Sequence, residues 1–237
     1  MCLAGYIFQK DDAKALDIEW KGVLDFFHLP YFRMSACATG NPPFDKMSLF
    51  DRIEVESIMI GLIRKYMLLG IATSVDERDY NTWLGTKHIG DAYNYCCWQT
   101  LAGVQNWLSK SGVDGDVAYF FESGHASERH ANALMQRIFN QPSLRRSYRY
   151  LSHSFVDKVK VRPVQTADIL AYLHRKTIKD FGKRRARADF VELASGGPHE
   201  MFIANRGTVA DAIVNGWEQS FHISGSFGSL RFSNPVI

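Results

Sequence analysis

The residues best suited to chemistry lie in the run 162–172, Arg-Pro-Val-Gln-Thr-Ala-Asp-Ile-Leu-Ala-Tyr, which predicts a helix started by a proline. An advance of about 100° per residue places the polar side chains on one stripe, formed by Gln165, Asp168, Tyr172, Arg175 and Lys179. We expect Asp168 to look away from the packed side. It is then either the solvated carboxylate of an ordinary amphipathic helix or, because alanines at 167 and 171 allow close approach, a carboxylate lying against a strand.

Further carboxylates stand where predicted strands end. Glu122 lies at the end of the apolar run 116–124, for which we expect a strand covered on both faces, and Asp76 with Glu77 ends the run 70–77. Carboxylates that converge from strand ends bind Mg²⁺ or Mn²⁺, and two such ions stabilise the attacking and leaving oxygens in phosphodiester hydrolysis. The candidate metal ligands are Asp168, Glu122 and Asp76. Acids at strand ends are common, so the pattern alone does not identify a site.

The basic residues are concentrated around Asp168. The net charge is +3, but residues 129–187 carry 15 Lys and Arg against 3 acids. Guanidinium groups pair with phosphate oxygens and interleaved aromatic rings offer stacking faces, so the block predicts nucleic-acid binding unless it is an ordinary solvated face. The candidate phosphate-binding residues are Arg145, Arg146, Arg149, Arg175, Lys183, Arg184, Arg185 and Arg187.

The elements that would position these residues form an α/β pattern. Hydrophobic periodicity predicts helices at 11–27, 48–69, 91–110, 127–139 and from Pro163 onward, with a short one at 209–217. Apolar runs predict strands at 2–8, 31–38, 70–77, 116–124 and 155–161. The chain after Arg187 has little regular pattern. We therefore expect one domain over residues 1–193 and an irregular C-terminal extension over 194–237.

Composition excludes several classes of protein. With 46% hydrophobic residues the chain can bury a substantial core, and no apolar stretch approaches the roughly 20 residues that span a bilayer. The start lacks the features of a signal peptide, so we expect a cytoplasmic protein without a membrane partner. The four cysteines are expected to be buried filler, and single histidines such as His174 are expected at the surface or at caps. Neither a GxSxG elbow nor a phosphate-binding glycine loop is present.

The helix around Asp168 also carries a resemblance to a known family. The motif Gln-x-Ala-Asp-x-x-Ala-Tyr at 165–172, with Phe-Val-Asp-Lys at 155–158, Ala-Tyr-Phe-Phe-Glu-Ser-Gly at 118–124 and Leu-Ala-Gly-Tyr at 3–6, resembles the bacterial and phage family called "domain of unknown function 3800". The similarity covers most of residues 1–193. It implies an RNase H-like mixed sheet flanked by helices and a metal-dependent nuclease or a relative of one. On that comparison Asp168 and Glu122 match the late acidic positions and are the candidate catalytic residues.

The chain also departs from the family pattern. Members usually open with a strand bearing an Asp-Glu-x-Gly motif, and this chain begins after it, so we expect the first strand and its metal ligand to be missing. The family's His-x-x-Asp feature is replaced by Arg33-Met34-Ser35-Ala36. The first hypothesis is a Mg²⁺- or Mn²⁺-dependent nuclease serving phage defence or a mobile element. The second is a catalytically degenerate nucleic-acid-binding or regulatory protein on the same scaffold, and a third is a protein-interaction subunit that uses the C-terminal extension.

Overall fold

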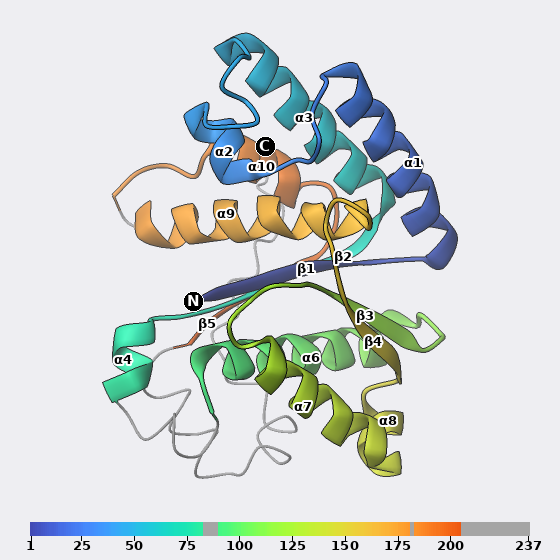
Figure 1. Ribbon diagram of the computed structural model, residues 1–237. Coiled ribbons are helices and arrows are strands. Elements are labelled where there is room, and N and C mark those ends of the chain that lie inside the picture. The colour runs from blue at the N-terminus through green and yellow to red at the C-terminus, as the bar shows by residue number, and fades with distance from the viewer. Residues whose placement is uncertain (83–89, 181–182, 205–237) are drawn as a thin grey trace. The chain divides into compact units, whose positions relative to one another are not determined.

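The computed structural model describes residues 1–82, 90–180 and 183–204, which form an α/β protein (Figure 1). The chain divides into two compact units. Unit 1 contains the described residues 1–3, 71–82, 90–155 and 200–204, and unit 2 contains 4–70, 156–180 and 183–199. The chain passes between the units several times, so the division does not follow the boundary at residue 193 that the sequence pattern predicts.

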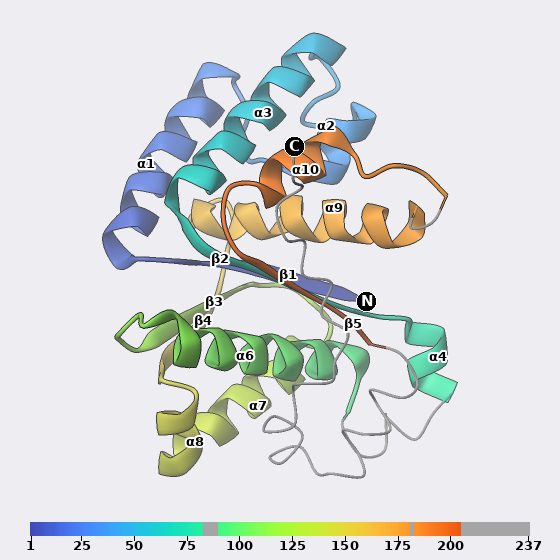
Figure 2. The same cartoon turned by 180° about the vertical axis from the view of Figure 1, so that it is seen from behind.

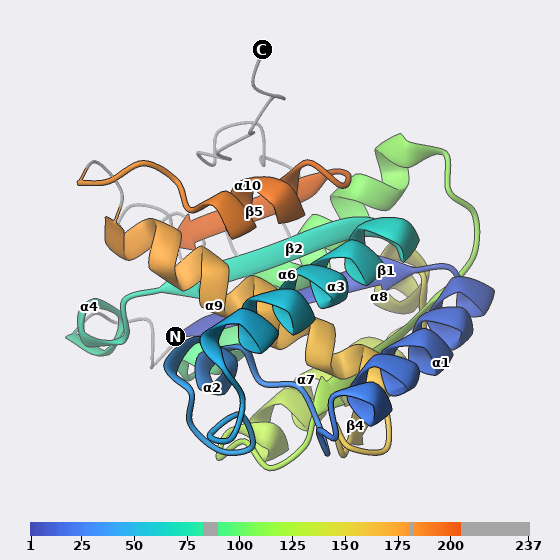
Figure 3. The ribbon, with the colours of Figure 1, turned by 90° about the horizontal axis from the view of Figure 1, so that it is seen from above.

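A three-stranded sheet contains β1 (Cys2–Phe8), β2 (Met67–Val75) and β5 (His199–Ala204), in the order β1-β2-β5 (Figure 3). Met1 and Val75 exchange both backbone hydrogen bonds, at 2.9 and 3.0 Å, which is the pattern of an antiparallel pair. Gly70 N donates to the carbonyl of Pro198 and the Ser74 hydroxyl to that of Phe202, so β5 advances in step with β2 and is parallel to it. The sheet is therefore small and mixed, with β2 as its central and most buried strand.

Unit 2 consists mainly of helices that pack on one another. They are α1 (Lys10–Phe26), α2 (Met34–Thr39), α3 (Leu49–Tyr66), the 3-10 turn η1 (Arg162–Val164), α9 (Gln165–Asp180) and α10 (Ala188–Ala194). α1 and α3 lie side by side, α10 packs on α3, and both α2 and α10 contact α9 (Figures 1 and 2). The core between them is apolar and includes Leu16, Trp20, Met59, Ile63, Leu170, Leu173 and Phe190.

Local sequence signals explain where the helices of unit 2 begin and end. Ser48 Oγ accepts the backbone N–H of Asp51 at 3.1 Å, and the Asp51 carboxylate accepts the N–H of Ser48, so α3 starts with a reciprocal capping box. Gly40 ends α2 with φ of 70°, a conformation that suits glycine because it lacks a Cβ. Pro163 lies in η1, directly before α9, as the sequence predicts.

Unit 1 contains α4 (Glu77–Thr82), α6 (Ala92–Ser111), β3 (Val117–Glu122), α7 (Glu128–Asn140), α8 (Pro142–Ser147) and β4 (Tyr150–Val156), whose last residue lies in unit 2. β3 and β4 form a separate two-stranded sheet. The aromatic residues of α6 are core residues, as expected, because Tyr93, Tyr95 and Trp98 are all buried. α6 itself packs on α7 and is capped by Asp91, which accepts the N–H of Asn94 at 2.8 Å.

Several predicted elements are wrong. The strand expected at 31–38 is instead the helix α2, and the strand expected at 155–161 lies earlier, as β4, because the Asp157 side chain and carbonyl accept N–H groups from Val159, Lys160 and Val161 and turn the chain. β3 is not covered on both faces, since Phe120 is 56% exposed. The region after Arg187, expected to be irregular, forms α10 and β5. The helix expected at 209–217 lies outside the described residues.

Two predictions from composition are confirmed within the described part of the chain. Its helices include none with the length and apolar character that crossing a bilayer requires. The cysteines are free thiols, and Cys37, Cys96 and Cys97 are buried, as expected for filler in a packed core. Burial raises the pKa of the Cys37 thiol to about 12, which makes it a poor nucleophile at neutral pH.

Candidate functional site

Asp168 contacts the start of a helix in unit 2. One of its carboxylate oxygens, Oδ2, accepts the backbone N–H of Met34, the first residue of α2, at 2.6 Å in a partly buried position. A helix start leaves its N–H groups without intrahelical partners and carries partial positive charge, so a carboxylate there is stabilising. Asp168 is therefore more than the solvated carboxylate of an amphipathic helix, because it caps α2.

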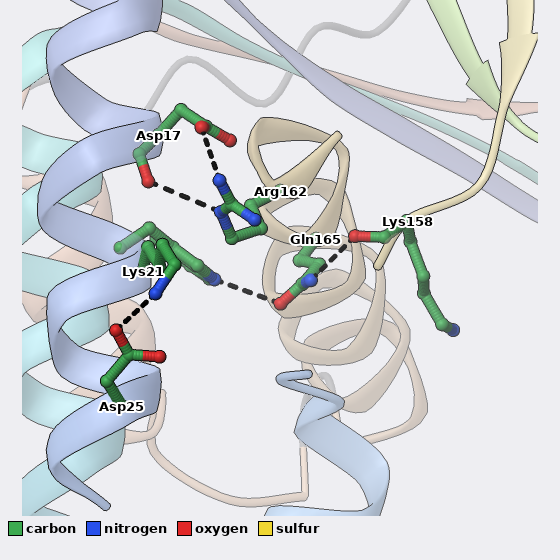
Figure 4. A network of polar contacts seen from close by, with 7 residues as sticks. Asp17, Lys21, Asp25, Lys158, Arg162 and Gln165 are labelled. Carbon is green, nitrogen blue, oxygen red and sulfur yellow. Dashed lines mark hydrogen bonds and ion pairs between the residues drawn. The ribbon is translucent and has the colours of Figure 1, made fainter. Parts of the chain in front are cut away.

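Gln165, one turn before Asp168, is the residue whose importance the sequence pattern did not indicate. Its side chain is buried, although we expected it on the exposed stripe. The Oε1 atom accepts Trp20 Nε1–H at 2.9 Å and the backbone N–H of Phe32 at 2.7 Å. The Nε2 atom donates to the carbonyl of Lys158 at 2.7 Å (Figure 4). One amide thus joins α1, the segment before α2 and the turn before η1. The only sequence signal is a glutamine in the first turn of an otherwise apolar helix start.

A second polar contact ties the same elements together. Arg162 of η1 donates to the Asp17 carboxylate of α1 at 2.7 Å, and both side chains are partly buried (Figure 4). Because a guanidinium has a rigid set of donors, this pair fixes the direction from which the chain enters α9. The surroundings of Asp168 are therefore set by contacts between segments that lie more than a hundred residues apart in the sequence.

The other two predicted metal ligands lie in unit 1, whereas Asp168 belongs to unit 2. Asp76 Oδ1 accepts the N–H groups of Arg78 and Asp79, at 2.9 and 3.4 Å, and so caps α4. Glu122 lies at the end of β3, as predicted, and is exposed. Among residues 1–82, 90–180 and 183–204, His, Cys, Asp and Glu side chains do not gather in groups of three or more that could hold a metal ion. Asp168 and Asp76 each accept backbone N–H groups at the start of a helix.

The predicted phosphate-binding residues of unit 1 are partly engaged in structure. Arg145 Nε donates to the carbonyl of Tyr150 at 3.3 Å, and its guanidinium lies 4.8 Å from the centre of the Phe139 ring. Arg149 donates to the carbonyl of Val113 at 2.5 Å. Arg146 is exposed. These contacts make Arg145 and Arg149 supports for the β4 region.

The predicted phosphate-binding residues of unit 2 are mostly exposed. Arg175 and Lys179 lie on the outer side of α9, and Lys183, Arg184 and Arg185 follow it, all of them exposed. The N–H groups of Lys183 and Arg184 donate to the carbonyl of Asp180, so these residues stay close to the end of α9. Arg187 differs, because its guanidinium binds the Asp189 carboxylate. The described residues of the basic segment 175–185 thus lie along α9 and directly after its C-terminal end.

His174 is buried on α9, which corrects the expectation of a surface or capping histidine. Its Nε2 atom is buried without a hydrogen-bond partner among the described residues. Burial disfavours the charged imidazolium and lowers the pKa of His174 to about 4. This side chain is therefore a neutral core residue at physiological pH.

We predict that His174 makes the protein sensitive to acid. Its folded pKa lies below its ordinary value, so the stability it confers is present above about pH 6.5 and is lost as the pH falls toward 4. Between pH 7 and 4.5 the loss should be about 2 kcal/mol, measured by urea unfolding. His174→Leu should lose that much less stability over the same interval. Equal losses in the two proteins would rule out this source of acid sensitivity.

We also predict a moderate effect on stability for Asp168→Ala. Removing the carboxylate leaves the N–H of Met34 without its acceptor and should reduce the free energy of unfolding by about 1 kcal/mol. Asp168→Asn, which keeps an oxygen acceptor, should cost less. Asp114→Ala, in an exposed turn, is the matched control and should be neutral. A neutral Asp168→Ala would show that the cap does not contribute.

The fold and these contacts define a mixed α/β protein with a carboxylate-capped helix and an exposed basic helix end. Scans against protein-family models, curated proteins and solved structures found no match for the chain.

Proposed function

We propose that this chain binds nucleic acid through the basic segment 175–185. Six of its eleven residues are Lys or Arg and one, Asp180, is acidic. The observation that supports this proposal is the exposure of Arg175, Lys179 and residues 183–185 along and directly after the end of α9. Cations at a helix C-terminus are favoured by the helix dipole, and a cluster of them can neutralise several phosphates of a nucleic acid.

We expect the protein to contact the sugar-phosphate backbone of the nucleic acid and not the edges of its bases. Lysine and arginine have long, flexible side chains, which pair with phosphates whatever the base sequence of the nucleic acid. Such binding releases counterions, so its affinity falls steeply as salt rises. The proposal is therefore a sequence-tolerant nucleic-acid-binding protein.

We further propose that the chain binds without cleaving. The segment in which the resemblance predicts a histidine and an acid holds Arg33, Ser35 and Ala36. That segment is the one that contacts Asp168, through the N–H of Met34. A site for two metal ions would need a second acid in this segment, near Asp168. Asp168 instead accepts a backbone N–H from it. This contact supports a degenerate relative of the RNase H-like nucleases.

The binding proposal is tested by charge reversal in the full chain. Fluorescence anisotropy with single- and double-stranded DNA and RNA oligonucleotides should give a log-log salt dependence with a clearly negative slope. The triple variant Lys183→Glu, Arg184→Glu, Arg185→Glu should bind about 100-fold more weakly at low salt, with a slope reduced by about 2 to 3. The matched control reverses three exposed lysines outside the segment, Lys10, Lys46 and Lys110.

Equal losses in the two triple variants would mean that only net charge matters and would contradict a binding segment at 175–185. Binding that does not depend on salt would also contradict the proposal. Cleavage is tested with the same oligonucleotides and added Mg²⁺ or Mn²⁺. We expect intact oligonucleotides, and cleavage that Asp168→Asn abolishes would favour the metal-dependent nuclease instead.

A further inference from the structure

Tyr172 of α9 is a partly exposed aromatic ring that is followed by cations on its side of the helix. An advance of about 100° per residue places Arg175, Lys176 and Lys179 on that side, three, four and seven residues further on. Arg175 and Lys179 are exposed, and Lys176 Nζ lies 5.6 Å from the centre of the Tyr172 ring. The ring thus adjoins the start of the basic segment 175–185 and borders three of its cations.

The acid one turn before Tyr172 is engaged elsewhere. Asp168 accepts the N–H of Met34, so its charge is directed to the start of α2. The cations follow Tyr172 toward the C-terminal end of α9, where the helix dipole favours positive charge. The surface beyond the ring is therefore positively charged.

The aromatic residues that alternate with arginines at 144–150 do not offer such a ring. Tyr148 and Tyr150 are only 3% and 2% exposed and belong to the core of unit 1. A side chain buried to this extent cannot stack on a base of a bound nucleic acid. The stacking faces that the sequence pattern predicts at 144–150 are therefore used for packing.

Phe139 of α7 is the other exposed ring of the basic block with a cation over it. It is 42% exposed, and the Arg145 guanidinium lies 4.8 Å from its centre. Both groups are occupied, because the Phe139 ring packs on Tyr150 with 6.3 Å between ring centres and Arg145 donates to the carbonyl of Tyr150. Tyr172, with exposed cations beside it, is the better placed of the two rings.

A ring bordered by cations suits an unpaired base. The base stacks on the face of the aromatic side chain, while the cations neutralise the phosphates on either side of that base. Lys176 sits on a flexible four-carbon stem, so its ammonium group can move from the ring to a phosphate. In a duplex the faces of the bases are covered by the neighbouring base pairs, so a stacking residue favours single strands.

We propose that Tyr172 stacks on an unpaired base of a single-stranded nucleic acid that the basic segment 175–185 holds. This inference rests on the proposed function and names the class of nucleic acid that the segment takes. Tyr172 contacts the face of the base and not its edge, so binding stays tolerant of sequence. Single-stranded DNA and RNA share this chemistry, and both serve as probes.

Fluorescence anisotropy with the full chain tests the inference on single-stranded and blunt-ended double-stranded oligonucleotides of equal length. Tyr172→Leu should weaken binding of the single strands about 10-fold and leave binding of the duplexes unchanged. The slope of affinity against salt should stay the same, because no charge is removed. Tyr172→Phe keeps the ring and should bind like the wild type. Phe139→Leu, the matched control in unit 1, should leave binding of both classes unchanged.

A measurement on the unmodified protein guards against variants that fail to fold. A strand of the same length and charge, with abasic sites in place of its nucleosides, should bind about 10-fold more weakly than the normal strand. Equal binding of the two strands would overturn the inference, because it would show that the bases are not contacted.

The outcomes separate this inference from the proposed function. If Tyr172→Leu weakens binding of both classes equally, or of neither, the stacking role is wrong and the basic segment stands. A loss of single-strand binding in Phe139→Leu, and not in Tyr172→Leu, would place the stacking residue in unit 1 and overturn the inference. Absence of binding to every oligonucleotide would contradict the proposed function and the inference with it.

Discussion

Gln165→Met is expected to reduce the free energy of unfolding by about 4 kcal/mol. Methionine has nearly the same length and volume, so the change removes hydrogen bonds without opening a cavity. The side chain would no longer accept from Trp20 and Phe32 or donate to the carbonyl of Lys158. A buried donor that loses its acceptor costs about 1 to 3 kcal/mol, and this variant leaves two of them, Trp20 Nε1–H and the N–H of Phe32.

Equilibrium unfolding in urea measures this loss, with two comparisons. Trp20→Phe removes one donor and leaves Gln165 Oε1 bound to the N–H of Phe32, so it should cost only about 1 kcal/mol in hydrogen bonding. Gln136→Met, an exposed change on α7, should be neutral. If Gln165→Met costs less than about 1 kcal/mol, the amide does not join α1, the segment before α2 and the turn before η1 in the way its contacts indicate.

Gly70→Ala is expected to cost about 3 kcal/mol, although it adds a single methyl group. Gly70 lies in the central strand β2, and a Cβ there would lie 2.3 Å from Cδ2 and 2.6 Å from Nε2 of His199, and 2.9 Å from Cε1 of Tyr6. The antiparallel pairing of Met1 with Val75 places Tyr6 opposite Gly70, which explains the close approach. Overpacking of this kind outweighs the gain of less than about 1 kcal/mol from a less flexible unfolded chain.

The control for this change is another glycine in the same sheet. At Gly5 of β1 a Cβ would have no neighbouring atom within 4 Å, so Gly5→Ala should be neutral or slightly stabilising. The double variant Gly70→Ala, His199→Ala should recover part of the loss, because the clashing ring is gone. A Gly70→Ala protein as stable as the wild type would show that the rings of Tyr6 and His199 do not close over the strand.

Hydrophobic periodicity was sufficient to predict the elements whose own residues carry a strong local pattern. The predicted helices at 11–27, 91–110 and 127–139 agree with α1, α6 and α7 to within one residue at either end, and the strand at 2–8 agrees with β1. These segments have strong helical or apolar patterns with turn signals at their ends. The long helix predicted to reach Leu69 ends at Tyr66, because Met67 onward is extended and belongs to the central strand.

Elements that depend on distant partners could not be predicted. The segment 31–38 alternates apolar and polar residues like a strand, yet it forms α2, and the N–H groups at its start are taken by Gln165 and Asp168 from more than 130 residues away. β5 and α10 likewise form where the local pattern is weak, because β2 and α3 provide their partners. Tertiary contacts overrode local preference in each case.

The sequence by itself determined that the chain is an α/β protein, that a helix begins near Pro163, and that basic residues gather after that helix. Those features follow from periodicity, proline geometry and charge, which are local. Only the tertiary structure decided what the side chains on that helix do. Asp168 became a helix cap, Gln165 a buried junction and His174 a neutral core residue, because the partners of a polar group are fixed by which distant segments pack against it.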